Sequence, residues 1–250
     1  PNSAIRKHKN FYPACQSRCK PILNHMLDGI AMDENLLIQE ISKDKTLATI
    51  YEDDVMLVIH KPAEFLSVPG KEITDAVYTR IKEKYPNATG PLIVHRLDMS
   101  TSGILLLTKT KEANKHLQNQ FIKRTIQKRY VALLDGDLTE DKGKITLPLR
   151  VDLDDRPKQL VCFEHGKNAE TRWEVIRREK DKTRVYFYPI TGRTHQLRVH
   201  AAHKNGLNAP IVGDDLYGKK QDRLHLHAEF IAFTHPATNE KMSFRVAPSF

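Results

Sequence analysis

The sequence has little cysteine and no long apolar run, and both scarcities narrow the class of protein. Its 250 residues include three cysteines, Cys15, Cys19 and Cys162, which do not suit the disulfide framework of a small secreted domain. No apolar run approaches the length of a membrane span, and the amino-terminal stretch lacks the apolar core of a signal peptide. We therefore expect a cytoplasmic protein in a reducing setting, without a membrane partner.

Motifs that bind metals and nucleotides are also missing. The chain has no phosphate-binding P-loop and no dinucleotide-binding glycine fingerprint. The histidines of residues 195–203 lack the spacing that places two ligands on one helix face. Cys15, Cys19 and His25 would form half of a zinc site, but no fourth ligand follows at a recognisable spacing. We therefore predict that the protein holds no metal.

Positive charge, by contrast, is abundant. Forty Lys and Arg residues against 31 Asp and Glu residues give a formal charge of +9 and a pI near 9.4. This balance favours a polyanionic partner such as nucleic acid. Cations crowd two short segments, residues 115–129 and 172–184, which strengthens that interpretation.

The pattern of apolar and polar residues changes near residue 48. Residues 1–48 show little periodicity and are predicted to form an extension of unknown role, whereas residues 49–250 alternate apolar runs with turns. The expected strands or extended pieces are residues 55–59, 65–70, 91–94, 104–107, 130–134, 145–149, 160–163, 171–177, 183–189 and 224–234. The expected helices are residues 76–85, 111–123 and 194–203. This order is not strictly βαβ, so it predicts an α+β fold with a large mixed, mostly antiparallel sheet and flanking helices.

The first candidate for chemistry is Asp98, in the segment His95–Gly103, whose sequence is His-Arg-Leu-Asp-Met-Ser-Thr-Ser-Gly. It lies between two predicted buried strands, where a carboxylate is costly unless something uses it or pairs with it. The alternative is a turn aspartate whose carboxylate accepts backbone hydrogen bonds from residues 100–103. This segment alone leaves both interpretations open.

A second cluster of polar side chains follows the predicted strand that ends at Pro189. Gly192 allows a tight turn, and a helix over residues 194–203 would present its amino-terminal N–H groups to an anion. The donors in this cluster are Arg193, His195, Gln196, Arg198 and His200. The pattern suits binding of phosphate or an RNA backbone, and a solvated basic helix with structural histidines is the alternative.

Together these segments resemble the RluA-type pseudouridine synthases. The resemblance covers about residues 50–250, and several motifs in one order are far more specific than any single motif. The motifs that carry it are residues 95–103, Lys128-Arg-Tyr130 with Ala132, residues 192–200, residues 210–214 with 216–218, and residues 226–228 with His235-Pro236. Residues 66–70 and 156–159 are similar to the subgroup of this family that acts on both tRNA and ribosomal RNA.

The resemblance implies a pseudouridine synthase fold with a central catalytic cleft, and an enzyme that isomerises specific uridines in a tRNA anticodon stem-loop, large-subunit rRNA or both. It implies that Asp98 attacks or deprotonates the sugar of a flipped-out uridine, with Arg198 as its ion-pair partner. It also implies that Tyr130 packs against the base and helps to remove the carbon-bound proton. Arg96 matches the arginine that fills the space left by the base. The RNA-binding residues are predicted to be Arg96, His95, Arg193, His195 and Gln196.

An isomerisation without redox change or group donor implies that no cofactor is needed. We expect RNA as the partner and a monomeric protein. One alternative is a catalytically inactive RNA-binding module with the same fold, which would bind RNA in a salt-sensitive way without forming product. Another is a metal-dependent nuclease that uses the histidines, although acidic residues do not gather around them.

Overall fold

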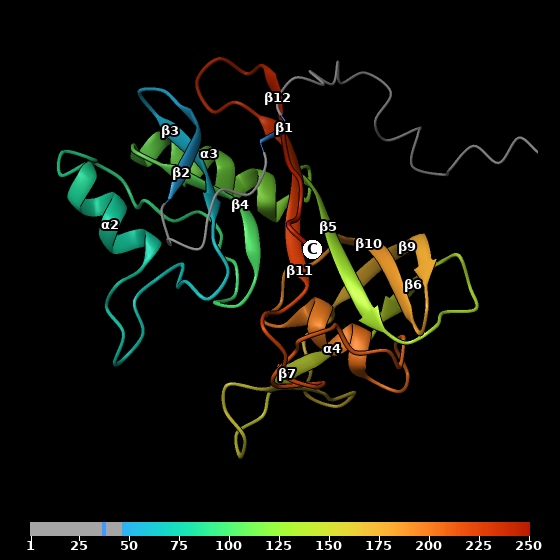
Figure 1. Cartoon of the computed structure of the whole chain (residues 1–250). Coiled ribbons are helices and arrows are strands. Elements are labelled where there is room, and N and C mark those ends of the chain that lie inside the picture. The colour runs from blue at the N-terminus through green and yellow to red at the C-terminus, as the bar shows by residue number, and fades with distance from the viewer. Residues whose placement is uncertain (1–36, 39–46) are drawn as a thin grey trace, which may run out of the picture. The chain divides into compact units, whose positions relative to one another are not determined.

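The computed structural model describes residues 37–38 and 47–250 (Figure 1). Within the predicted extension, β1 (Leu37–Ile38) pairs in parallel with β12 (Lys241–Val246). The rest of that extension up to residue 46, including the possible zinc ligands, lies outside the described residues. None of the described helices is long and apolar enough to cross a membrane.

One mixed sheet organises this part of the chain. Along its main path the strands follow the order β2, β3, β4, β11, β5, β10, β9, β6, and β12 pairs with β11. The bounds are β2 (Ala48–Glu52), β3 (Met56–Lys61), β4 (Ser102–Thr108), β5 (Gln127–Asp135), β6 (Lys142–Thr146), β9 (Glu170–Glu179), β10 (Lys182–Pro189) and β11 (Leu226–Thr234). Neighbours are antiparallel except β4 with β11 and β1 with β12. The predicted α+β fold with a mixed, mostly antiparallel sheet is confirmed.

Three helices are described, and Figure 1 shows α2 and α3 beside the β2–β4 end of the sheet and α4 beside β5. Their bounds are α2 (Val77–Lys84), α3 (Lys111–Ile122) and α4 (Gln196–Ala202). The hydroxyl of Thr110 caps α3 by accepting the N–H of Ala113 at 3.2 Å. Helix α2 ends just before Tyr85, because the residue that precedes a proline disfavours helical backbone.

The central strands are buried on both faces. In the core cluster on one face of β3 and β4, Leu57 accompanies Val77 of α2, and in the cluster on the other face Val58 accompanies Leu117 of α3. Strands that are covered on both faces have continuous apolar sequences, which is why these strands could be predicted from the sequence. A further cluster joins β5 and β10 to α4. Tyr130 packs against both this cluster and the α2 cluster, so it lies where these two core clusters meet.

Two expected strands are wrong. Residues 91–94 form only an isolated bridge, as does the expected extended piece 65–70. The predicted strand 145–149 is divided at Pro148 between β6 and β7 (Leu149–Val151), and β7 pairs with β8 (Gln159–Val161) in a small separate sheet. Each of these segments contains a proline, which has no N–H to donate to a strand ladder.

Candidate active site

A cleft of about 660 Å³ lies where residues 94–101, 121–130 and 189–198 meet. Seven of the eight predicted site residues line it, and His195 does not. The seven are His95, Arg96, Asp98, Tyr130, Arg193, Gln196 and Arg198. The fold therefore brings together two sequence motifs that lie about a hundred positions apart.

Strand register places Asp98 close to Tyr130. Gly103 pairs with Ala228 on β11, and Ala228 pairs with Tyr130 on β5. Gly103 has a φ of +120°, and a Cβ atom at this position would collide with the backbone of Ala228. Because only glycine combines this backbone conformation with so close an approach, Gly103 lets the end of the Asp98 turn lie against β11.

The residues on either side of Asp98 are held by the segment that begins at the end of β3. The hydroxyl of Ser67 donates to the carbonyl of Leu97 at 2.7 Å and accepts the N–H of Leu97 at 3.1 Å. The ammonium of Lys61 donates to the carbonyl of Met99 at 3.0 Å. Asp98 is thereby fixed between two anchored neighbours.

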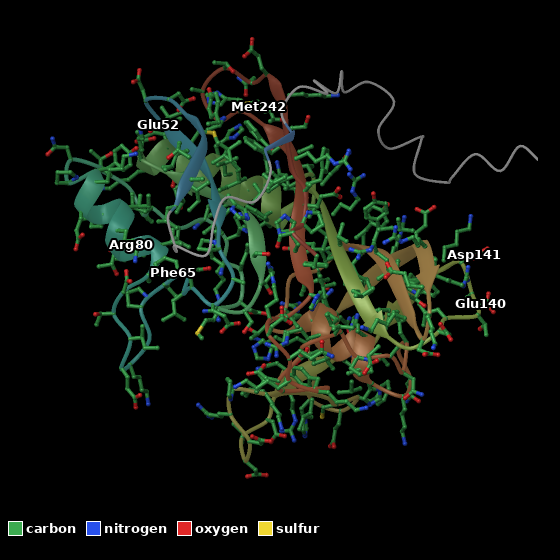
Figure 2. The ribbon with its side chains drawn as sticks, in the orientation of Figure 1. Glu52, Phe65, Arg80, Glu140, Asp141 and Met242 are labelled. Carbon is green, nitrogen blue, oxygen red and sulfur yellow. The ribbon has the colours of Figure 1, made fainter. Side chains whose placement is uncertain are left out.

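Lys61 is fully buried, and the sequence analysis assigned it no role. Its ammonium also donates to the carbonyls of Pro62 at 2.8 Å and Phe65 at 2.6 Å, and these acceptors offset the cost of burying it. Burial lowers the pKa of Lys61 to about 7, while the charge of Asp98 acts to raise it. Phe65 packs in turn against the guanidinium of Arg80 on α2, 4.5 Å from its ring centre (Figure 2). A lysine two positions after the apolar run 55–59 and directly before a proline is the signal that could have identified this residue.

The carboxylate of Asp98 is half-buried and unpaired. Within the described part of the chain it makes no hydrogen bond and no ion pair within 4.0 Å, and only the backbone carbonyl of Asp98 accepts a bond, from Thr101 N–H at 3.1 Å. The alternative that this carboxylate accepts backbone hydrogen bonds from residues 100–103 is therefore wrong. Its oxygens are open to a substrate in the cleft.

Arg198, the predicted partner of Asp98, pairs with Asp214. The side chains of Arg198 and Asp214 are 3% and 0% exposed. Nε of Arg198 donates to Oδ2 of Asp214 at 2.8 Å, and Nη2 donates to Oδ1 at 2.6 Å. Nη2 also contacts Asp215 at 2.9 Å. The expected direct ion pair with Asp98 is not formed among these described contacts, because Asp214 already meets the guanidinium in a bidentate arrangement.

Asp98 nevertheless acts on Arg198 through its charge. Burial opposes the charge of the guanidinium, and the hydrogen bond and charge of Asp214 together with the charge of Asp98 raise the pKa of Arg198. Asp214 is itself pre-arranged, because its Oδ1 accepts the N–H groups of Leu216 and Tyr217, each at 3.0 Å. Asp214 belongs to a motif that the sequence singled out, but its role depended on long-range packing.

Tyr130 presents a phenolic hydroxyl with no hydrogen-bond partner among the described residues. Burial, and then the charge of Asp98, raise the pKa of Tyr130. The hydroxyl is therefore protonated at neutral pH, and it lies in the cleft where a substrate would meet it.

His95 has a structural contact as well as a place in the cleft. Its Nε2 accepts the backbone N–H of Leu106 at 2.9 Å. Burial, and then the charge of Lys128, lower the pKa of His95 to about 3. The ring is therefore a neutral acceptor that satisfies a strand N–H, and its contact with RNA remains a prediction.

Gln196 and His195 shape the turn that leads into α4. Oε1 of Gln196 accepts the hydroxyl of Thr191 at 2.7 Å and the N–H of Arg193 at 3.0 Å. His195 has a left-handed φ of 52°, and its Nδ1 shares a hydrogen bond with the hydroxyl of Tyr217 at 2.8 Å. Binding of RNA by these two residues also remains a prediction.

The charges that line the cleft are strongly unbalanced. Asp98 is its one acidic residue, against five cationic residues, Arg96, Arg124, Lys128, Arg193 and Arg198. Arg96 and Arg193 are exposed at the rim. A surface of this kind suits a polyanion.

No group of three His, Cys, Asp or Glu side chains in residues 47–250 could hold a metal ion.

Comparison with known proteins identifies the family. The family model described as RNA pseudouridylate synthase matches residues 55–203. The chain therefore belongs to the RNA pseudouridylate synthase family, and it is an isomerase that forms pseudouridine in RNA. The family resemblance expected from the sequence is confirmed.

Named relatives narrow the comparison. Over 212 residues the chain is 44% identical to the dual-specificity RNA pseudouridine synthase RluA of Escherichia coli strain K12, covering 82% of this chain and 94% of that protein. The protein of the same name from Pasteurella multocida is 45% identical over 215 residues, covering 83% and 95%. The solved structure of human RNA pseudouridylate synthase domain containing 1 matches with a TM-score of 0.68 and 27% identity, covering 84% of this chain and 87% of that one.

Proposed function

We propose that Asp98 starts the conversion of uridine to pseudouridine in a nucleotide flipped out of structured RNA. In this isomerisation the bond from N1 to C1′ breaks, the uracil turns, and C5 bonds to C1′. The C5 proton is lost and N1 gains a proton, so atoms and charge balance. The observation that supports the role of Asp98 is that it is the one carboxylate lining a cleft with five cations.

Asp98 acts either by attacking the sugar carbon or by removing a sugar proton. Both routes need an ionised carboxylate. The charges of Arg198 and Asp98 attract each other, and Asp214 holds this guanidinium beside the cleft. Tyr130, whose hydroxyl is protonated, packs against the base. Its oxygen takes the proton from C5 while its own proton passes to water in the cleft, and water supplies the proton that N1 gains.

The cationic rim binds the RNA backbone. Arg96 is exposed, lines the cleft, and makes no hydrogen bond to any described residue. A guanidinium can stack on bases as well as pair with phosphate. Arg96 therefore fills the space that the flipped base leaves, which offsets an unstacking cost of a few kcal/mol. Arg193, His95, His195 and Gln196 complete the proposed RNA-binding set.

The proposed targets are a tRNA anticodon stem-loop and large-subunit rRNA. This assignment is supported by the two bacterial relatives named as dual-specificity enzymes, which match over four-fifths of the chain. We propose that the enzyme acts as a monomer in the cytoplasm, and size-exclusion chromatography with light scattering would measure its mass.

Release of tritium from RNA labelled at C5 of uridine measures turnover directly. Asp98→Asn should reduce the release to background while the Kd for RNA changes by less than about threefold, because a neutral amide of the same shape replaces the reacting carboxylate. The matched control is Asp181→Asn, which makes the same change in the exposed turn between β9 and β10, where a positive φ of 56° suits asparagine. Full turnover by Asp98→Asn would exclude the proposed role, and salt-sensitive binding without release by the unmodified protein would favour the inactive module.

A further inference from the structure

Lys128 lies on the same face of β5 as Tyr130. Side chains two residues apart on a strand share a face and are separated by about 6.7 Å along it. The intervening Arg129 points the other way, where its Nε donates to Glu229 at 2.8 Å. Both Lys128 and Tyr130 line the cleft. The ammonium is thus close to the reacting nucleotide without being at its centre.

The ammonium of Lys128 has no anion in the described part of the chain. It makes no hydrogen bond and no ion pair within 4.0 Å there, and the ring centre of Phe121 lies 5.9 Å away, at the outer limit of a cation–π contact. The two buried cations of the site are compensated, Lys61 by three carbonyls and Arg198 by Asp214. A largely desolvated cation without a partner is unfavourable, so this one is suited to an anion that the substrate brings.

Lys128 is not directed at the reacting carboxylate. The charge of Asp98 affects the pKa values of Tyr130, Lys61 and Arg198, in each case after the effect of burial. Burial alone lowers the pKa of Lys128 to about 8, so no carboxylate acts strongly on it.

A glycine leaves this ammonium accessible from the cleft. A Cβ atom at Gly192, in the turn between β10 and α4, would lie 4.0 Å from Nζ of Lys128. Gly192 also lines the cleft, so no side chain at this position covers Nζ.

From this arrangement we infer that Lys128 is a positioning residue whose ammonium binds a backbone phosphate next to the flipped uridine. Phosphates are the permanent anions of RNA, and they fix the register and orientation of a bound chain. A phosphate held one strand repeat from Tyr130 would orient the sugar toward Asp98. This inference rests on the proposed function, since it places the target nucleotide in the Asp98 cleft.

Salt-dependent RNA binding tests the inference. Lys128→Met removes the charge and retains an unbranched stem, and the expected result is about a tenfold higher Kd. The slope of log K against log salt should fall in magnitude by about 0.7–0.9, the share of one phosphate contact. Lys128→Arg should keep the Kd within about threefold of that of the unmodified protein and should restore the salt slope. The control is Lys241→Met, at the exposed start of β12 and outside the cleft lining, which should leave both values unchanged.

A neutral methylphosphonate at either phosphate flanking the target uridine locates the contact. At the contacted phosphate, Lys128→Met should cause no further loss of affinity, whereas it should cause its full loss at the other. Full loss at both positions would overturn the inference, as would an unchanged salt slope in a variant with unchanged Tm. Binding is measured here without turnover, so failure of the Asp98 mechanism would appear only in tritium release, and failure of the phosphate contact only in these binding data.

Discussion

Replacing Arg198 by methionine tests whether the charge of its guanidinium serves the reaction as well as the fold. Arg198 is the bidentate partner of Asp214, a carboxylate that is 0% exposed. Removing one member of a buried ion pair leaves the other charge uncompensated, at a cost of about 3–5 kcal/mol. Methionine preserves most of the unbranched side chain, so the cavity contributes little. Arg198→Met should therefore lose both stability and activity.

A second substitution separates these two losses. In the variant with both Arg198→Met and Asp214→Asn, no unpaired charge remains buried. The asparagine oxygen can still accept the N–H groups of Leu216 and Tyr217, so the turn keeps its bonds. Stability should return to within about 1–2 kcal/mol of the unmodified protein. Activity should stay lost, because the guanidinium charge that interacts with Asp98 is absent from both variants.

Urea unfolding gives the stability of each variant, and tritium release at saturating RNA gives its rate. The expected pattern is a low rate in both variants but low stability only in Arg198→Met. If the rate recovers together with stability in the double variant, the reasoning is refuted, because Arg198 then acts through the fold alone. Asp214→Asn by itself should be destabilised, because it leaves the guanidinium as the uncompensated buried charge.

Two further predictions concern the frame of the site. Gly103→Ala should lower the free energy of unfolding in urea by at least about 2 kcal/mol, because it combines a positive φ with a backbone collision. The control is Gly70→Ala, whose Cβ would make only ordinary contacts at 3.7 Å. Equal losses of stability in the two variants would contradict the argument. The pKa of His95 is lowered from 6.5 to about 3, so below pH 6.5 the unfolded chain binds a proton that the folded one does not, and stability falls with pH by up to about 1.4 kcal/mol per unit. Unfolding measured from pH 7 to 4 should show a shallower loss in His95→Gln, and an unchanged slope would count against a neutral buried ring.

Local sequence patterns predicted the elements that depend on local causes. Strands β3 and β4 are continuous apolar runs, and α3 is an apolar stripe behind a threonine cap. The predicted strand 91–94 begins with a proline, and beside it the N–H of Leu106 donates to the ring of His95 instead of to a strand backbone. No hydrophobic period reports that a side chain has replaced a ladder bond.

The site was predicted as a set of motifs, but its pairings could not be. Asp214 takes Arg198 through contacts between segments that meet only in the folded chain. Lys61 supports the turn of Asp98 through the carbonyl of Met99, 38 positions away, and its sequence neighbours do not reveal which carbonyl it meets. Motif order thus indicated which residues gather, whereas distances and burial determine which of them remain open to a substrate.

The central claim is that Asp98 forms pseudouridine at defined uridines in RNA. Mapping pseudouridine at single-nucleotide resolution in cells that lack this protein, and in the same cells supplied with either the unmodified chain or Asp98→Asn, tests it most directly. The account predicts that the unmodified chain restores pseudouridine at specific positions in tRNA and large-subunit rRNA, and that Asp98→Asn, expressed at the same level, restores none. Restoration by Asp98→Asn, or no difference between cells with and without the unmodified chain, would contradict it.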